Sequence, residues 1–165
     1  MIRKGLPHYA VGKVISGFQR GSKELGCPTA NFTHEVVDNL PSDVETGIYY
    51  GWANVDNGPV YKMVMSVGWN PYYKNEKKSM ETHILHKFEN DFYGSSLKVC
   101  MLGYLRPEKD FKSLDELIEA IQNDIKNASD TLEQPEWQKF KDHDFFLPNK
   151  NGLITNGNHQ SSLLQ

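Results

Sequence analysis

The sequence has little cysteine and no long apolar segment. Two cysteines occur in 165 residues, Cys27 and Cys100, which are too few for a disulfide framework and lack the spacing of metal ligands. No apolar run approaches the ~18–20 residues that a membrane span needs, and the N-terminal segment has no apolar core of the kind found in secretory signals. We therefore expect a reduced cytoplasmic protein with no membrane association. The sequence leaves open whether a fraction of the protein is mitochondrial.

An excess of positive charge is also missing. The chain has 21 acidic and 18 basic residues, for a net charge of -3, which argues against a nucleic-acid partner. Its length and its 38% hydrophobic content are those of one folded domain. We assign that domain to residues 1–148 and expect 149–165, which are polar and low in aromatic residues, to be a flexible tail.

Short segments rich in β-branched and aromatic residues predict a mainly β fold. The Asn57-Gly58 step between two of them is typical of a hairpin turn. Because no helix is expected between these segments, the pattern favours an antiparallel barrel or sandwich. The predicted strands cover residues 9–16, 47–55, 60–69, 79–88 and 96–105.

One helix is predicted near the C-terminus. Ser113 followed by Glu116 fits a capping box, and Pro135 ends the element. The apolar residues that follow the cap recur at helical spacing, which we interpret as a packing face rather than a surface for a partner. They are Leu114, Leu117, Ile118, Ile121, Ile125, Ala128 and Leu132.

A glycine-rich, basic segment covers residues 16–26. Gly17, Gly21, Arg20 and Lys23 are the combination that lets backbone N–H groups and cations approach an anion. The spacing is not that of a Walker A loop, because three residues rather than four separate Gly17 from Gly21 and a serine precedes Lys23. An anion site and a structural turn both remain open.

The stretch Gly26-Cys27-Pro28-Thr29-Ala30-Asn31-Phe32 places two neutral oxygen donors one residue apart. On an extended backbone the side chains of Thr29 and Asn31 point to the same side. Mg²⁺ prefers oxygen ligands and often takes one or two from the protein together with phosphate oxygens. The alternative is a turn in which both side chains bond to neighbouring backbone.

Glu81 is an acid inside a strand otherwise built of Met, Thr, Ile and Leu. It could orient an attacking hydroxyl or accept its proton, or it could pair with a nearby lysine on a solvated edge. His83 shares its face of the strand, and His86 lies on the opposite one. Two histidines on opposite faces make a poor metal pair.

Arg106, Lys109 and Phe111 follow the last predicted strand. Cations mixed with a ring could bind a flat, phosphorylated ligand, although ordinary surface charges at the end of a strand explain the same residues. Upstream, the aromatic side chains of Trp69, Tyr72 and Tyr73 could form a wall for a planar ligand or close the core.

Together these segments resemble the eukaryotic riboflavin kinases (flavokinases). The matching stretches occur in the same order and cover about residues 7–147; they are GFQRGSKELGCPTANF, TGIYYGWA, SVGWNPYYKN, KKSMETHILHKFENDFYG and GYLRPEKDF. The resemblance implies a six-stranded antiparallel Greek-key barrel with a C-terminal helix. It also implies transfer of the γ-phosphate of ATP to the 5′-hydroxyl of riboflavin, which gives FMN and ADP.

The resemblance also implies a role for each candidate residue. Thr29 and Asn31 correspond to the Mg²⁺ ligands beside ATP, and Glu81 to the catalytic carboxylate. The remaining positions correspond to contacts with one of the two substrates. These are Gly17, Lys23, Ile84, His86 and Tyr93 for ATP, and Arg106, Lys109 and Phe111 for the flavin.

Some choices stay open. Oxygen ligands also admit Zn²⁺ or Mn²⁺ in place of Mg²⁺. A small barrel favours a monomer, and the chain is too short for a second domain that would make FAD. The alternative function is a non-catalytic barrel that binds a nucleotide or a single strand of nucleic acid.

Overall fold

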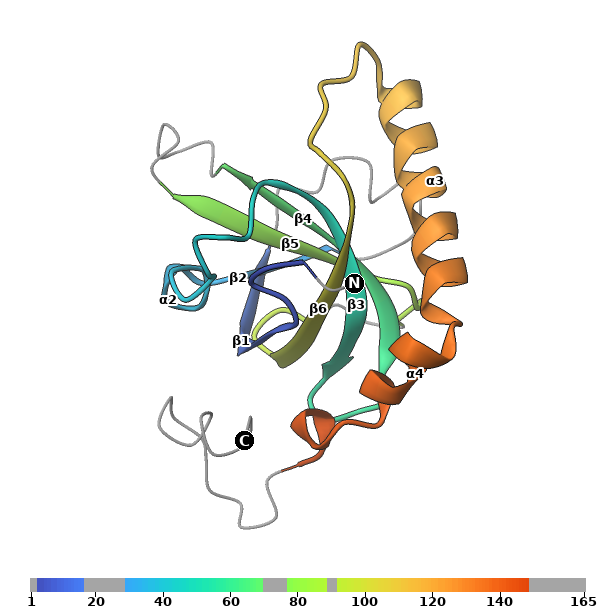
Figure 1. Cartoon of the computed structure of the whole chain (residues 1–165). Helices are drawn as coiled ribbons and strands as arrows, with labels where there is room; N and C mark the ends of the chain where they lie inside the picture. The colour runs from blue at the N-terminus through green and yellow to red at the C-terminus, as the bar shows by residue number, and fades with distance from the viewer. Residues whose placement is uncertain (1–2, 17–28, 70–76, 89–91, 149–165) are drawn as a thin grey trace.

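Six strands form a closed antiparallel barrel in the computed structural model, which describes residues 3–16, 29–69, 77–88 and 92–148 (Figure 1). The order around the barrel is β1-β2-β5-β4-β3-β6. β3, β4 and β5 follow one another, and β6 returns to pair with β3, which is a Greek-key arrangement. The strands are β1 (His8–Ser16), β2 (Thr29–Phe32), β3 (Gly47–Val55), β4 (Tyr61–Trp69), β5 (Lys78–Ile84) and β6 (Ser96–Arg106).

The predicted mainly β class is confirmed, with several differences in detail. β2 was not among the predicted strands, and a short helix, α2 (His34–Val37), lies between β2 and β3, where we had expected no helix. β5 ends at Ile84, so His86 and Phe88 lie beyond the strand in which we had expected them. The β3–β4 hairpin is present, but Asp56 and Asn57 are its residues with positive φ, at 50° and 59°. The Asn57-Gly58 step therefore lies one residue past the centre of the turn. Aspartate and asparagine can occupy this left-handed region because their short polar side chains tolerate it.

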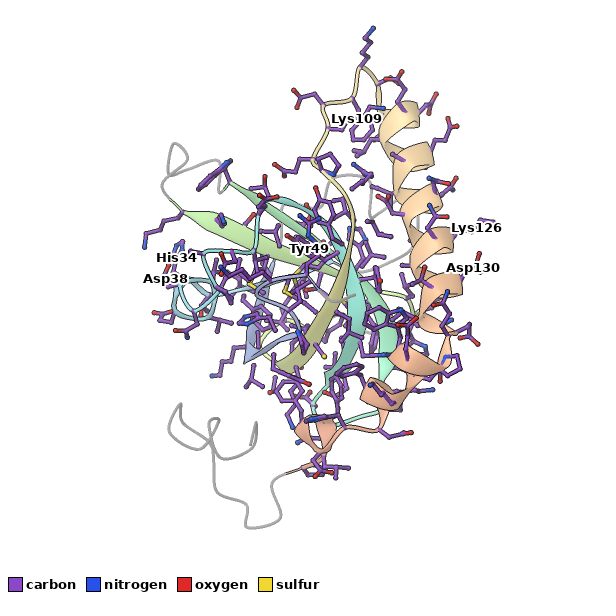
Figure 2. The ribbon with its side chains drawn as sticks, in the orientation of Figure 1. His34, Asp38, Tyr49, Lys109, Lys126 and Asp130 are labelled. Atoms are coloured by element: carbon purple, nitrogen blue, oxygen red, sulfur yellow. The ribbon has the colours of Figure 1, made fainter. Side chains whose placement is uncertain are left out.

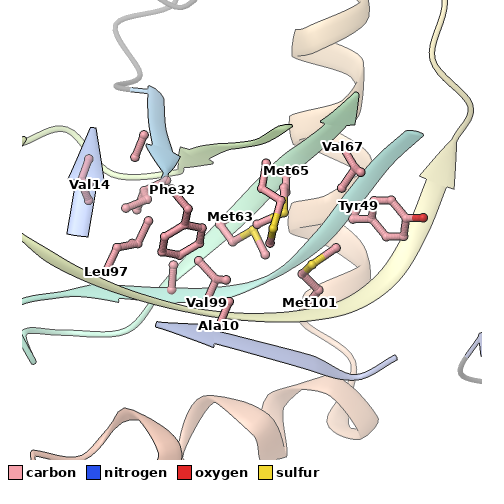
Figure 3. Close-up of a cluster of buried hydrophobic side chains, with 14 of the residues drawn as sticks. Ala10, Val14, Phe32, Tyr49, Met63, Met65, Val67, Leu97, Val99 and Met101 are labelled. Atoms are coloured by element: carbon pink, nitrogen blue, oxygen red, sulfur yellow. The ribbon is translucent and has the colours of Figure 1, made fainter. Parts of the chain in front are cut away.

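The barrel interior is filled by apolar side chains that alternate along every strand (Figure 3). Met63, Met65, Met80 and Met101 are each fully buried there. Gly51 on β3 allows close contact with β6, because a Cβ at this position would lie 1.8 Å from the carbonyl oxygen of Cys100. Since the interior is closely packed, a ligand has to bind on the outside of the barrel.

α3 (Leu114–Leu132) and α4 (Pro135–Lys141) cover one outer side of the barrel, whereas α2 lies away from them, against β1, β2 and β5 (Figure 1). The Ser113 hydroxyl accepts a hydrogen bond from the Glu116 N–H at 3.2 Å, as the predicted cap requires. A second apolar cluster lies under α3 and α4, where the indole N–H of Trp52 on β3 donates to the carbonyl of Trp137 at 3.0 Å. The helices are α2 (His34–Val37), α3 (Leu114–Leu132), α4 (Pro135–Lys141) and the 3₁₀ helix η1 (Asp144–Phe146).

Only the C-terminal half of the predicted stripe on α3 serves as packing. Ala128 and Leu132 are buried against the barrel, whereas Leu117 and Ile121 line a cavity and Leu114 is 52% exposed. Among the described residues, no helix combines the length and the apolar character that crossing a membrane requires. The predicted tail, 149–165, lies outside the described residues, as do Tyr72 and Tyr73.

Candidate active site

Two rows of paired residues run across the outer face of the barrel. The first row joins five strands through the pairs Asn31–Glu81, Glu81–Ser66, Ser66–Ile48 and Ile48–Arg106. Residues directly opposite one another on antiparallel strands point to the same face, with Cβ atoms about 4.5–5.5 Å apart. The row therefore brings together three residues far apart in the sequence, Asn31, Glu81 and Arg106.

The second row begins with Thr29, which pairs with His83, and His83 in turn pairs with Val64. It lies beside the first row, because Thr29 and Asn31, and likewise Glu81 and His83, are two residues apart on their strands. Two residues span about 6.6 Å along a strand. Thr29, Asn31, Glu81 and His83 thus form the corners of a four-residue patch on β2 and β5.

The patch contains buried polar atoms that need a partner. Thr29 is 1% exposed and Asn31 is 7% exposed. Their side-chain oxygens, Oγ1 and Oδ1, have no hydrogen-bond partner within the described part of the chain. Leaving a buried polar group unsatisfied costs roughly 1–3 kcal/mol. The structure therefore does not support the alternative, in which these two oxygens accept hydrogen bonds from the local backbone of a turn.

These two oxygens fit a divalent ion. They are neutral oxygen donors from adjacent outward positions on β2, and both lack a protein partner among the described residues. Magnesium is commonly held by one or two protein oxygens, phosphate oxygens and water. No cluster of three or more histidine, cysteine or acidic residues that could hold a metal occurs in the described ranges.

A cavity of about 280 Å³ lies between the rows and α3. Glu81, His83 and Ser66 contribute to its polar floor, and Trp69, which is 43% exposed, stands at the wall rather than in the core. Leu117 and Ile121 of α3 form an apolar side opposite this floor. Ile48 and Val64 of the barrel, together with Arg106, Glu108, Lys109, Asp110, Phe111 and Asp124, complete the lining.

Arg106 is held at the cavity by a buried acid on α3. Its Nε and a terminal nitrogen each donate to one carboxylate oxygen of Asp124 at 2.8 Å, and Asp124 is only 4% exposed. Such two-point contacts fix the orientation of a guanidinium group. The cations of Arg106 and Lys109 lie 5.8 and 5.7 Å from the ring centre of Phe111. Figure 2 shows Lys109 on the connection between β6 and α3.

His83 is neutral at ordinary pH. Burial lowers its pKa from 6.5 to about 4, because the charged imidazolium would lose its hydration. The side chain is 6% exposed, and its Nδ1 has no hydrogen-bond partner among the described residues. The imidazole therefore has an unused hydrogen-bonding atom beside the candidate metal ligands.

The residues predicted to contact ATP are spread over several places. His86 is exposed and stacks on Tyr61, with ring centres 3.9 Å apart. The Tyr93 hydroxyl donates to the carbonyl of Thr29 at 3.5 Å. Ile84 is fully buried in the barrel interior, so its side chain does not reach the outer face. Gly17 and Lys23 lie outside the described residues.

Sequence reasoning assigned no role to Ser66 or Asp124. Ser66 is opposite Glu81 only because of the strand register, which no local pattern reveals. Asp124 lies on the helix face that carries the apolar stripe, one residue before Ile125. The sequence pattern that could have identified Asp124 is an acidic residue at the border of an apolar helix face.

On one outer face, the barrel combines a buried pair of oxygen ligands, a carboxylate and a cavity with an apolar side. This construction is that of an enzyme with a small-molecule substrate.

Comparisons with known proteins agree. Residues 4–132 match the flavokinase family, described as riboflavin kinase. A riboflavin kinase of Mus musculus is 62% identical over 154 residues, which cover 93% of this chain and 99% of that protein. One of Homo sapiens is 60% identical over 149 residues, which cover 90% and 96%. The crystal structure of riboflavin kinase from Trypanosoma brucei aligns with a TM-score of 0.67 and 30% identity, over 86% of this chain and 88% of that one.

The chain belongs to the riboflavin kinase (flavokinase) family. The expected family, barrel architecture and enzymatic character are confirmed. The alternative of a non-catalytic binding barrel is not favoured by these relatives.

Proposed function

We propose that this protein transfers the γ-phosphate of ATP to the 5′-hydroxyl of riboflavin, giving FMN and ADP. A bond forms between the 5′-oxygen and the γ-phosphorus, and the bond from that phosphorus to the β–γ bridging oxygen breaks. The observation that carries the proposal is the first row: it sets a candidate metal ligand, Asn31, next to a carboxylate, Glu81, and leads into the cavity at Arg106.

We propose that Thr29 and Asn31 hold the divalent ion through Oγ1 and Oδ1. Their burial without a partner among the described residues supports this role. When bound, Mg²⁺ offsets the negative charge of the phosphate oxygens. Neutral ligands suit that task because the nucleotide itself brings the anionic ones. Zn²⁺ and Mn²⁺ also bind oxygen ligands, and we propose Mg²⁺ because its usual coordination matches this pair.

Glu81 acts on the hydroxyl of the acceptor. It lines the cavity and is directly opposite Asn31, so an alcohol at the end of the cavity would meet the carboxylate beside the transferred phosphate. Glu81 orients the 5′-hydroxyl in line with the phosphorus and accepts its proton. Positioning of this kind supplies much of the rate in phosphoryl transfer, since the protein makes no covalent bond.

The cavity takes the flavin. Its volume of about 280 Å³ is close to the lower end of the range for small-molecule sites, roughly 300–1,000 Å³. Leu117 and Ile121 offer an apolar surface to the flat ring system, while Arg106, Lys109 and Phe111 close over it from the connection between β6 and α3. The Asp124 carboxylate keeps the Arg106 side chain in that position.

ATP would then lie on the β2 side of the patch. We propose contacts to ATP at His86 and Tyr93, since the Tyr93 hydroxyl reaches the backbone of Thr29. Ile84 could contribute only through its backbone, because its side chain is inside the barrel. Gly17 and Lys23 remain candidates for the phosphates on the basis of sequence alone. We also propose that the protein acts as a cytoplasmic monomer, without nucleic acid.

The direct test incubates the purified protein with riboflavin, ATP and MgCl₂ and separates the flavins by chromatography. We expect FMN and ADP in equal amounts, no FAD, and no product without the divalent ion. A Glu81→Gln sample with an unchanged circular dichroism spectrum is the matched control and should form FMN far more slowly. Absence of FMN from the folded wild-type protein would contradict the proposed function.

A further inference from the structure

His83 has a position that mirrors that of Glu81. Both project from β5 on the same face, two residues apart, and both line the cavity. Glu81 is opposite Asn31 and His83 is opposite Thr29. On its other side Glu81 faces Ser66, and His83 faces Val64. The imidazole therefore lies between one candidate metal ligand and the flavin cavity.

The neighbours of His83 in the described part of the chain do not provide a hydrogen-bond partner for its Nδ1. The residue is 6% exposed, and its Nδ1 is buried without a partner there. Val64 offers no polar atom in its side chain. A buried donor or acceptor is normally paired. His83 lines the cavity and carries an orphaned nitrogen, which suggests that the side chain adjusts to pair with a group on the ligand.

We propose that His83 is a specificity residue that hydrogen-bonds an inner hydroxyl of the ribityl chain of riboflavin. This inference rests on the proposed function. The 4′- and 3′-hydroxyls are two and three carbons from the reacting 5′-oxygen. Glu81 and His83 are two residues apart on β5, so Glu81 holds the terminal hydroxyl while His83 holds one of these inner hydroxyls. The hydroxyl bonded to His83 does not react.

A neutral imidazole suits this partner. In its neutral form the ring offers one donor and one acceptor, as a hydroxyl group does. Sites built to bind a substrate hydroxyl discriminate strongly against analogues that lack it, because the protein atom is then left unpaired. In the described structure the Nδ1 of His83 has no partner. It would stay unpaired with an analogue that lacks the hydroxyl, and this is the condition for strong discrimination.

The test compares riboflavin with a flavin that carries a 5-hydroxypentyl chain at N10, which keeps the terminal hydroxyl and lacks the inner ones. Three variants are needed: His83→Phe removes the hydrogen-bonding atoms, His83→Asn keeps a polar group near Nδ1, and Thr82→Val is the control. Thr82 is adjacent on β5 but fully buried, opposite Ala30 and Met65 of the interior. kcat and KM are measured for both flavins, with folding checked by circular dichroism.

We expect His83→Phe to lower kcat/KM for riboflavin by about 10–100-fold, the effect of losing one buried hydrogen bond, mainly through KM. The same variant should change kcat/KM for the hydroxypentyl flavin less than about threefold, within the ordinary scatter of a substitution that removes no contact. His83→Asn should recover part of the preference for riboflavin, and Thr82→Val should keep all of it.

Equal losses with both flavins in His83→Phe would overturn the inference, because the residue would then serve the phosphate side or the fold. A misfolded His83→Phe leaves His83→Asn as the test: a preference for riboflavin identical to that of the wild type would also overturn it. Failure of the wild-type protein to phosphorylate riboflavin at all would instead contradict the proposed function, so the two failures are distinguishable.

Discussion

Replacing Thr29 by valine should have opposite effects on folding and on binding. Valine keeps the β-branched shape of threonine and removes the hydroxyl. That hydroxyl is buried, since Thr29 is 1% exposed, and Oγ1 has no partner among the described residues. In the unliganded protein it is therefore a cost to the folded state, whereas in the complex it would be a metal ligand.

The size of each effect follows from this burial. An unsatisfied buried polar group costs roughly 1–3 kcal/mol. Without ligand, the free energy of unfolding of Thr29→Val should therefore be at least that of the wild type, and higher by up to this amount. The affinity for Mn²⁺–ADP should fall by at least ~10–100-fold, the loss that follows even from removing residues that only support a metal ligand.

Urea denaturation measures the first effect, and Mn²⁺ titration followed by electron paramagnetic resonance in the presence of ADP measures the second. Thr82→Val is the matched control, because Thr82 is also buried with an unpaired Oγ1 but is paired with residues of the barrel interior. It should gain similar stability and keep its metal affinity. If Thr29→Val were destabilised by more than ~1 kcal/mol, its hydroxyl would have a structural partner, and an unchanged Mn²⁺ affinity would remove Thr29 from the metal site.

Three further outcomes follow. Glu81→Gln should lower kcat for FMN formation by ~10²–10⁴-fold, as expected for loss of a general base, and near-normal turnover of the folded variant would exclude that role. Asp124→Asn should lower the free energy of unfolding by roughly 1–3 kcal/mol in urea denaturation, because the Arg106 charge loses its partner in a partly exposed pair. The same variant should raise the KM for riboflavin. A change in the free energy of unfolding below ~0.5 kcal/mol, the scatter of surface substitutions, would contradict the role of Asp124 in holding Arg106. Since the pKa of His83 is lowered from 6.5 to about 4, the unfolded chain binds more protons between these values, so acidification across this range should reduce the free energy of unfolding by up to ~3 kcal/mol. His83→Asn should lack that part of the pH dependence, and an identical pH profile in wild type and variant would refute the assignment.

The strands and the helix cap could be predicted because their signals are local. β3 occupies the residues predicted for it, and Ser113 caps α3 as its spacing with Glu116 indicates. β5 ends earlier than its alternating pattern implied, at Ile84. The alternation beyond this point continues in the sequence, so the end of the strand is set by pairing partners rather than by the residues themselves.

The site was predictable in its parts and not in its assembly. The same-side placement of Thr29 and Asn31 follows from the period of a strand. That Glu81 is opposite Asn31 depends on the register between β2 and β5, which is set by the closed barrel. Burial of the two oxygens and the two-point contact between Arg106 and Asp124 arise from tertiary packing, so spacing alone left structural alternatives open.

The central claim is that one divalent ion binds to Thr29 Oγ1 and Asn31 Oδ1 while Glu81 faces the acceptor oxygen. The most direct measurement is a crystal structure with Mn²⁺, ADP and riboflavin, in which anomalous scattering locates the ion. We predict the anomalous peak at about 2.0–2.3 Å from both side-chain oxygens, as for oxygen ligands of such ions, with the 5′-hydroxyl of riboflavin donating a hydrogen bond to the Glu81 carboxylate. A peak remote from β2, or a riboflavin whose ribityl chain points away from Glu81, would contradict the account.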